Sequence, residues 1–406
     1  MKKVLAVALL LTVLLTGCGP MSKTDNSAEV KNIGEHDSNV KLDIYPKNDL
    51  FDTVGKFDRA QYNTLSKSQK SLYIIMDNAI YDMSTGYVAL GKCSSDDIET
   101  AYHALRCDRP EYFWLPSTYT LRTSGEGSEI RFAQKSGDWL YSKSEREKLE
   151  KEIKDDLATF LQTVDGNMTE YELELKAHDH LARLITYDHA ALKEPDTRFY
   201  AWSIIGAFKY GKAVCEGYSR ALQLICFMMN IDCTVITGET SEPHMWNLVN
   251  IDDDWYHVDL TSNDTDSIPY HFFFNVTTDY MLNGRSIDPK SNIVTSTNDR
   301  CNLFLPRSDE TEYNYHIMNS SYIASMSHVE ATVVSHVCDA VRSGTRRVEF
   351  AVSAQLGFIF GNDDASKKFN LERCISAANA ELSATQRIRS YSYGGVEGAL
   401  GFVISW

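Results

Sequence analysis

The 406-residue sequence is short of positive charge. Lys and Arg together number 40, against 56 Asp and Glu, and the formal net charge is −16 at pH 7. Nucleic acids and anionic membrane surfaces attract proteins with clustered Lys and Arg. We therefore expect no nucleic-acid partner and no binding to anionic lipid through surface charge.

Long hydrophobic runs are also missing after the first 17 residues, and the sequence has no internal repeats or low-complexity segments. A membrane-spanning helix needs about 20 consecutive apolar residues. No later segment reaches that length. A chain of this size exceeds one compact core, so we expect two or three globular domains.

Metal-binding spacings are absent as well. The nine cysteines form no CxxC pair and no Cys/His ligand pattern, which argues against a structural metal site. His178 and His180 stand two residues apart on an expected helix, where they point to different faces, so we expect solvated or partly packed side chains rather than metal ligands. In an exported protein a disulfide such as Cys93–Cys107 is possible, but spacing alone leaves it open.

The N-terminus predicts export. Lys2 and Lys3 precede a short apolar run, VLAVALLLTVLL, as in a secretory signal peptide. The following Leu15-Thr16-Gly17-Cys18 resembles a bacterial lipobox. That resemblance implies a lipoprotein signal peptide over residues 1–17 and lipid modification of Cys18. The protein would then be extracytoplasmic and anchored to the bacterial membrane by lipid. The alternative is a plain secretory signal in which Cys18 has no role.

The remaining patterns predict an α+β protein. The polar stretch 18–50 has few large apolar residues and resembles a flexible tether. The other expected parts are an N-terminal α+β domain (51–140), a central domain (141–300) and a C-terminal small α/β domain (301–406). Thr169, followed three residues later by Glu172, predicts a capping box at a helix start.

One cysteine is expected at the start of an amphipathic helix. An apolar stripe with helical spacing extrapolates backwards to about Val214, which places Cys215 in the first turn. Unpaired backbone N–H groups and the positive end of the helix dipole meet there. Both stabilise thiolate over thiol, so the position favours a nucleophile.

A base and an acid follow in the sequence. Two apolar-rich strands flank an acidic turn, with His244 before it and Asp259 after it. If Asp252-Asp253 is a two-residue loop, His244 faces Thr261 and Asp259 is its diagonal neighbour on the same face, within reach of the imidazole. A three-residue loop would change this parity. Cysteine, histidine and aspartate thus occur in the order of a thiol triad.

These residues lie in motifs that resemble the transglutaminase-like superfamily, whose pattern is G-x-x-x-C-x-G-Y, then H-x-W-N, then W-Y-x-V-D-x-T. The matching stretches here are Gly211–Tyr218, His244–Asn247 and Trp255–Thr261, and HDHLARLITYD (178–188) resembles an upstream helix of bacterial members. The resemblance covers about residues 165–285. Many members continue D-x-T-W-D, whereas this chain has Thr261-Ser262-Asn263-Asp264.

The resemblance implies a papain-like or transglutaminase-like core that performs acyl transfer without a metal or organic cofactor. Cys215 would attack an amide carbonyl, His244 would move the proton, and Asp259 would orient the imidazole. The Cys215 backbone N–H is a candidate oxyanion donor. The motif residues Trp246, Asn247, Tyr218 and Gly217 are expected to support the site or line its cleft.

The expected function is a cysteine peptidase or amidase that hydrolyses peptide or isopeptide bonds in a peptide or protein substrate, with cell-wall peptide as one candidate. Water is the second nucleophile unless the cleft excludes it, which favours hydrolysis. One alternative is a catalytically silent cell-surface lipoprotein that binds peptide or glycan. Another is a true amine-incorporating transglutaminase. The aromatic residues near the cysteine suggest a cleft lined for peptide or sugar, but core packing explains them equally well; they are Tyr200, Trp202, Tyr210 and Tyr218.

Overall fold

The computed structural model describes residues 59–116, 118–132, 139–264, 269–294, 301–354, 356, 370–396 and 398–406. The expected signal peptide, Cys18 and the tether lie outside these residues. Contacts group the chain into two compact units. The first comprises the chain up to Asp253 with Asp259–Thr261 and Arg285–Pro306, and the second comprises Asp254–Val258, Ser262–Gly284 and Arg307–Trp406. The domain boundaries expected at 140 and 300 stay predictions.

The N-terminal part of the first unit combines helices with a small sheet. Strand β3 pairs antiparallel with both β1 and β2, which gives the order β1-β3-β2. The elements are α1 (Ala60–Thr64), α2 (Lys67–Tyr81), β1 (Val88–Gly91), α3 (Ser95–Asp108), β2 (Thr120–Ser124) and β3 (Gly127–Arg131).

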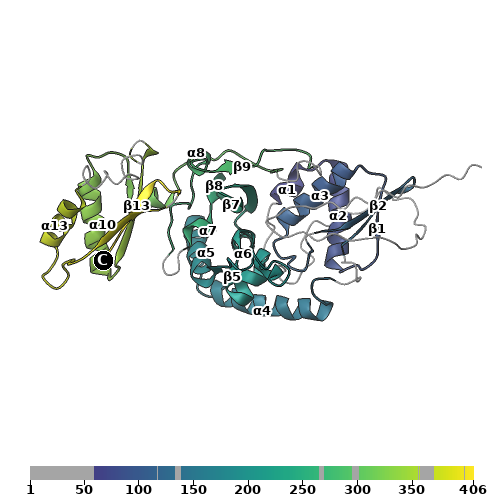
Figure 1. The fold of residues 1–406 in the computed structure, drawn as a ribbon, viewed down its shortest axis with the longest axis horizontal. Helices are drawn as coiled ribbons and strands as arrows, with labels where there is room; N and C mark the ends of the chain where they lie inside the picture. The colour runs from purple at the N-terminus through teal and green to yellow at the C-terminus, as the bar shows by residue number, and fades with distance from the viewer. Residues whose placement is uncertain are drawn as a thin grey trace, which may run out of the picture. The chain divides into compact units, whose positions relative to one another are not determined.

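The middle of the chain places a central helix, α6, against antiparallel strands (Figure 1). Strand β6 pairs with β7 and with β9, within a sheet of order β8-β7-β6-β9. The elements are α4 (Lys143–Leu161), α5 (Glu170–Leu184), β4 (Thr186–Tyr187), η1 (Phe199–Trp202), η2 (Gly206–Tyr210), β5 (Lys212–Ala213), α6 (Cys215–Met228), β6 (Cys233–Glu239), β7 (Pro243–Ile251), β8 (Asp254–Val258), α7 (Leu260–Asn263), α8 (Thr278–Met281) and β9 (Ser286–Ile287).

Side-chain caps fix where several helices begin. The Thr169 hydroxyl accepts from the Glu172 backbone N–H, and the Glu172 carboxylate accepts from the Thr169 backbone N–H. This confirms the predicted capping box of α5. Ser66 and Ser142 form the same reciprocal pair at α2 and α4. Each box satisfies backbone N–H groups that have no partner inside the helix.

The turn between β7 and β8 is the shorter of the two loops that the sequence left open. Strand β7 ends at Ile251 and β8 begins at Asp254, so Asp252 and Asp253 alone form the loop. Both have positive φ, 50° and 72°, as a type I′ hairpin turn requires. One detail of the prediction is wrong. Strand β8 ends at Val258, and Thr261 lies in helix α7 rather than opposite His244 in a strand.

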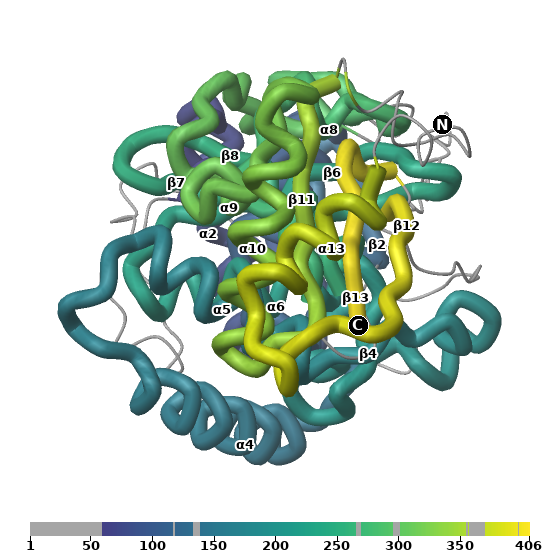
Figure 2. The backbone as a smooth tube through the Cα atoms, turned by 90° about the vertical axis from the view of Figure 1, so that its left-hand side faces the viewer, coloured from purple at the N-terminus to yellow at the C-terminus, as the bar shows by residue number. Residues whose placement is uncertain are grey.

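The second unit contains a four-stranded sheet with two longer helices, α10 and α13, on the same side of β13 in Figure 1. The order is β10-β11-β13-β12, with β10 and β11 parallel and the other pairs antiparallel. Figure 2 shows β11, β13 and β12 side by side. After residue 301 the elements are α9 (Tyr315–Met318), β10 (Tyr322–Ile323), α10 (Val329–Ser343), β11 (Arg347–Val352), α13 (Leu371–Glu381), β12 (Ser392–Gly395) and β13 (Gly401–Ser405).

Helices α10 and α13 and the strands of this sheet share one apolar core. Its buried side chains include Val333 and Val337 of α10, Ile375 of α13, and Phe350 and Phe402 of the strands. The mixture of helices and strands through the chain confirms the α+β class. Among the described residues, no helix has the length and apolar character that a membrane crossing requires.

Candidate active site

Cys215 is the first residue of α6, as the apolar stripe predicted. Val214 is the N-cap, and its backbone N–H donates to the Ala201 carbonyl at 3.0 Å. Gly217 lies in the first turn, where a Cβ would overlap the Ala201 carbonyl oxygen and stand 2.7 Å from the Ala213 Cβ. The glycine of the motif is therefore needed for close packing: it lets the start of the helix approach the segment that follows η1.

Cys215 packs against the residue of β7 that follows His244. Cys215 is 2% exposed and shares an apolar cluster with Cys107, Val235 and Met245, the residue after His244. One helical turn further along α6, the Ser219 hydroxyl donates to the Met245 carbonyl at 3.1 Å. The Asn247 amide donates in turn to the Ser219 carbonyl at 3.0 Å. These bonds fasten the first turns of α6 to β7.

His244 and Asp259 are brought together. The His244 Nε2 lies 2.8 Å from Asp259 Oδ2, and the side chains are 10% and 0% exposed. An ionised carboxylate only accepts hydrogen bonds, so this contact places the ring hydrogen on Nε2. The Nδ1 atom is then the ring nitrogen that can accept a proton from a thiol.

A second side chain, the cationic Arg285, bonds to the same carboxylate, and no motif in the sequence indicated it. Arg285 Nη1 donates to Asp259 Oδ2, the oxygen that also accepts from His244, and the Arg285 side chain is 6% exposed. Burial by itself would raise the pKa of Asp259. The charges and hydrogen bonds of His244 and Arg285 outweigh burial and hold that pKa well below its usual range. Asp259 is therefore a buried but ionised carboxylate.

The four expected supporting residues are all buried, so they pack beneath the site rather than line an open cleft. Trp246 is fully buried, and its ring stacks with that of His244 at a centroid distance of 5.9 Å. Tyr218 is also fully buried and stacks with Tyr187 at 6.3 Å. Asn247 is the link to Ser219 described above.

The aromatic residues near η1 and η2 differ from Tyr218 in exposure. Tyr210 is 50% exposed and its ring lies 4.2 Å from that of Tyr200, while Trp202 is half-buried. These three residues precede the short strand β5 that leads into Cys215. Tyr200 and Tyr210 thus form an aromatic pair that reaches the surface shortly before the start of α6 in the sequence.

Helix α3 supports α6 through a polar contact that sequence reasoning missed. The Glu216 carboxylate, next to Cys215, pairs with Arg106 at 3.2 Å and with Arg220 at 2.8 Å. Arg220 also donates to the Arg106 carbonyl at 2.7 Å, and Gln223 donates to the Cys107 carbonyl at 2.8 Å. The end of α3 is thus bonded along the first three turns of α6.

Cys107 offers a comparison with Cys215 in the same apolar cluster. Its Sγ lies 3.7 Å from His103 Nε2, yet burial raises the pKa of the Cys107 thiol to about 12. A thiol with that pKa remains protonated at neutral pH and is a poor nucleophile. The described cysteines, Cys93 among them, form no disulfide, so the Cys93–Cys107 bridge that spacing left open is not present.

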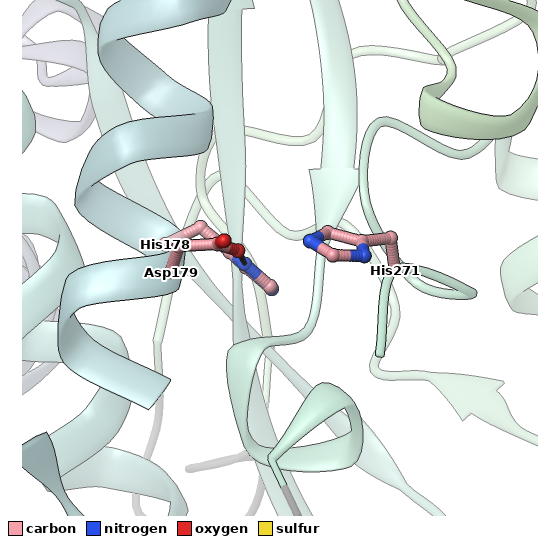
Figure 3. Close-up of side chains that lie close together, drawn as sticks. All are labelled: His178, Asp179 and His271. Carbon is pink, nitrogen blue, oxygen red and sulfur yellow. Dashed lines mark hydrogen bonds and ion pairs between the residues drawn. The ribbon is translucent and has the colours of Figure 1, made fainter. Parts of the chain in front are cut away.

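The other histidines of the core motif region have separate partners. His178 is buried with Nδ1 3.2 Å from Asp179 Oδ1, and Figure 3 shows both side chains projecting from one helix, α5. The expectation of a solvated or partly packed side chain is therefore wrong for His178. His180 is half-buried and packs on Phe160 at 4.6 Å. His257 is buried, with Nε2 3.2 Å from the Thr278 hydroxyl.

Comparisons with known proteins agree with the motifs. Residues 158–260 match the model of the transglutaminase-like superfamily. The chain therefore contains a transglutaminase-like domain, and Cys215, His244 and Asp259 all lie within the matched range. Members of this superfamily are generally cysteine-based enzymes.

Among solved structures, one described as the crystal structure of a TGase is 14% identical with a TM-score of 0.26. The match covers 36% of this chain and spans less than half, 44%, of that one. A search of curated proteins gave no significant match.

Proposed function

We propose that the transglutaminase-like domain is a cysteine hydrolase that cleaves peptide or isopeptide bonds. The observation that carries the proposal is the buried, ionised Asp259 bonded to His244 Nε2, beside a helix that begins with Cys215. A carboxylate in this place fixes the imidazole and stabilises its protonated form. The helix start favours thiolate.

In this mechanism the Cys215 thiol gives its proton to His244 Nδ1 as sulfur bonds to the substrate carbonyl carbon. The Cys215 backbone N–H stabilises the oxyanion. Nδ1–H then protonates the amine as the C–N bond breaks, which leaves a thioester on Cys215. Water adds to the thioester, loses its proton to Nδ1 and releases the acid, and the sulfur regains its proton.

The test uses an iodoacetamide probe with mass spectrometry to find the alkylated cysteine. We expect Cys215 to react faster than free cysteine, whereas Cys107 in the same cluster stays unlabelled and is the internal control. Turnover of cell-wall peptides should disappear in Cys215→Ala. Slow labelling of Cys215 together with full turnover in Cys215→Ala would refute the proposal that Cys215 is the nucleophile of a cysteine hydrolase.

The product distinguishes hydrolysis from crosslinking. Release of free acid with no incorporation of a labelled primary amine supports the peptidase or amidase. Amine incorporation in place of acid release would identify a true transglutaminase.

A catalytically silent peptide- or glycan-binding protein is the second candidate, favoured by one observation: Cys215 is only 2% exposed and sits among apolar side chains. Binding of cell-wall peptide that is unchanged by Cys215→Ala, with no turnover in either protein, would support it over catalysis.

The proposal also includes a location. A lipid on Cys18 would hold the protein on the outer side of a bacterial membrane, where peptide substrates of the cell wall are found. We expect Cys18→Ala to move the protein from the membrane fraction to the soluble fraction. A variant that still sediments with membranes would contradict the lipid anchor.

A further inference from the structure

Asp259 is held from two sides. The His244 imidazole and the Arg285 guanidinium both donate to the Oδ2 atom, and Arg285 and Asp259 are 6% and 0% exposed at their side chains. A buried carboxylate that accepts from an imidazole and from a guanidinium is fixed in direction as well as in charge.

The sheet fixes where Arg285 lies. Arg285 directly precedes β9, whose residues Ser286 and Ile287 pair with Glu239 and Gly238 of β6. Gly238 also pairs with His244 on the other side of β6. Strand β6 therefore lies between the backbone that carries Arg285 and the backbone that carries the His244 imidazole, and it holds both.

Gly238 makes this approach possible. A Cβ at this position would overlap the Ser286 carbonyl oxygen and would stand 2.5 Å from Trp246 Cη2. Only a residue without a side chain allows β9 to lie this close to β6 while the Trp246 ring packs below His244. The close approach positions Arg285 rigidly, and rigid support is what a residue that orients a catalytic group needs.

We propose that Arg285 is a positioning residue of the thiol site, which holds the Asp259 carboxylate so that Oδ2 faces His244 Nε2. It acts through Asp259 and does not touch the substrate. By fixing the hydrogen on Nε2, it keeps Nδ1 free to accept the thiol proton. This inference rests on the proposed function, but its first test does not need enzymatic turnover.

The direct test measures which ring nitrogen of His244 carries the hydrogen. In ¹⁵N-histidine NMR spectra at pH 8, the His244 resonances are assigned by their absence in His244→Gln. We expect the Nε2–H tautomer in the wild type and a mixture of tautomers in Arg285→Met. The Arg285→Lys variant keeps a charge without the guanidinium fork and should retain more of the Nε2–H form. The control Arg307→Met removes an arginine from an exposed pair with Asp279.

Kinetics give the second readout. Arg285→Met should lower kcat about tenfold, a size common for coupled neighbouring groups, while KM stays within a factor of about two. Arg285→Lys should recover part of the loss. In an Asp259→Asn background, Arg285→Met should have almost no further effect, because Arg285 acts through the carboxylate.

The results separate the two proposals. An unchanged His244 tautomer in a folded Arg285→Met protein, or an equal loss with and without Asp259→Asn, overturns the role of Arg285. A rise in KM alone would instead make Arg285 a substrate contact. Failure of the proposed function appears elsewhere, as turnover that survives Cys215→Ala.

Discussion

Asp259 and Asp108 are two carboxyls of the first unit with nearly equal burial and opposite behaviour. Asp259 is 0% exposed and Asp108 2%. Asp108 accepts from the backbone N–H groups of Gln61 at 3.2 Å and Tyr62 at 2.9 Å. Burial raises the pKa of Asp108 to about 7, despite the opposing charge of Arg59 and these two bonds. The pKa of Asp259 moves in the other direction.

The difference lies in the partners. Asp108 ties α1 to the end of α3 by accepting from backbone groups. Asp259 bonds to the Arg285 guanidinium and to the His244 imidazole, and the His244 side chain is 10% exposed. Burial alone therefore does not mark a functional carboxyl. The proposal for Asp259 rests instead on the pairing of an ionised, buried carboxylate with a partly exposed imidazole.

The sharpest test of the comparison exchanges each carboxylate for an amide. Asp259→Asn can donate to Nε2 and so favours the wrong imidazole tautomer, and we expect kcat to fall by roughly 10³–10⁴-fold. Asp108→Asn should leave kcat per folded molecule unchanged. Peptide hydrolysis by both purified variants, with circular dichroism as the check of folding, measures this. Equal losses in the two variants would remove the distinction.

The pH dependence of stability should come from Asp108. A carboxyl whose pKa is raised in the folded protein contributes stability that is full below about pH 4 and is lost as the pH rises through about 7. The stability of the wild type relative to Asp108→Asn should therefore fall by up to about 1.4 kcal/mol per pH unit in this window. Urea unfolding of both proteins from pH 4 to pH 8 tests it. A constant difference would show that Asp108 does not titrate there.

Gly238→Ala should disturb the position of Arg285, the cationic side chain that bonds to Asp259. The added Cβ meets the Ser286 carbonyl and Trp246, so we expect a loss of about 1–3 kcal/mol in unfolding free energy. Activity should fall too, because β9 carries Arg285. Gly86→Ala, which meets no atom within 4 Å, is the matched control. Thermal unfolding that is equal for both variants would contradict the tight approach.

The smallest effect is expected at the hairpin turn. Asp253 has φ of 72°, and left-handed backbone costs an L-residue about 1–2 kcal/mol, part of which glycine avoids. Asp253→Gly should therefore stabilise the protein by roughly 0.5 kcal/mol and leave both buried carboxyls as they are. Asp254→Gly, inside β8, should destabilise it. Denaturant midpoints of the two variants measure these changes in stability. A lower midpoint for Asp253→Gly than for the wild type would count against the type I′ geometry.

Local patterns predicted the parts of the site that are close in sequence to a clear element. The apolar stripe located Cys215 at a helix start, and the acidic turn marked the hairpin between His244 and Asp259 but left its loop length open. The pattern could not show that β8 ends at Val258, because Thr261 is equally compatible with a strand or a helix.

The local patterns did not predict contacts between segments that are distant in sequence. Arg285 reaches Asp259 because β9 pairs with β6, and Glu216 is held by Arg106 from a helix more than a hundred residues earlier. Neither arginine belongs to a motif. Such pairs depend on how elements pack, which hydrophobic periodicity does not encode.

The bonds between α3 and α6 limit how the protein can be shortened. A recombinant fragment that starts at residue 158, where the family match begins, would lack Arg106 and the carbonyls that receive Arg220 and Gln223. Glu216, next to Cys215, would lose one of its two arginine partners. Such a fragment would expose an apolar and partly unsatisfied helix face and would tend to aggregate, so the smallest soluble piece that retains the thiol must begin before α3.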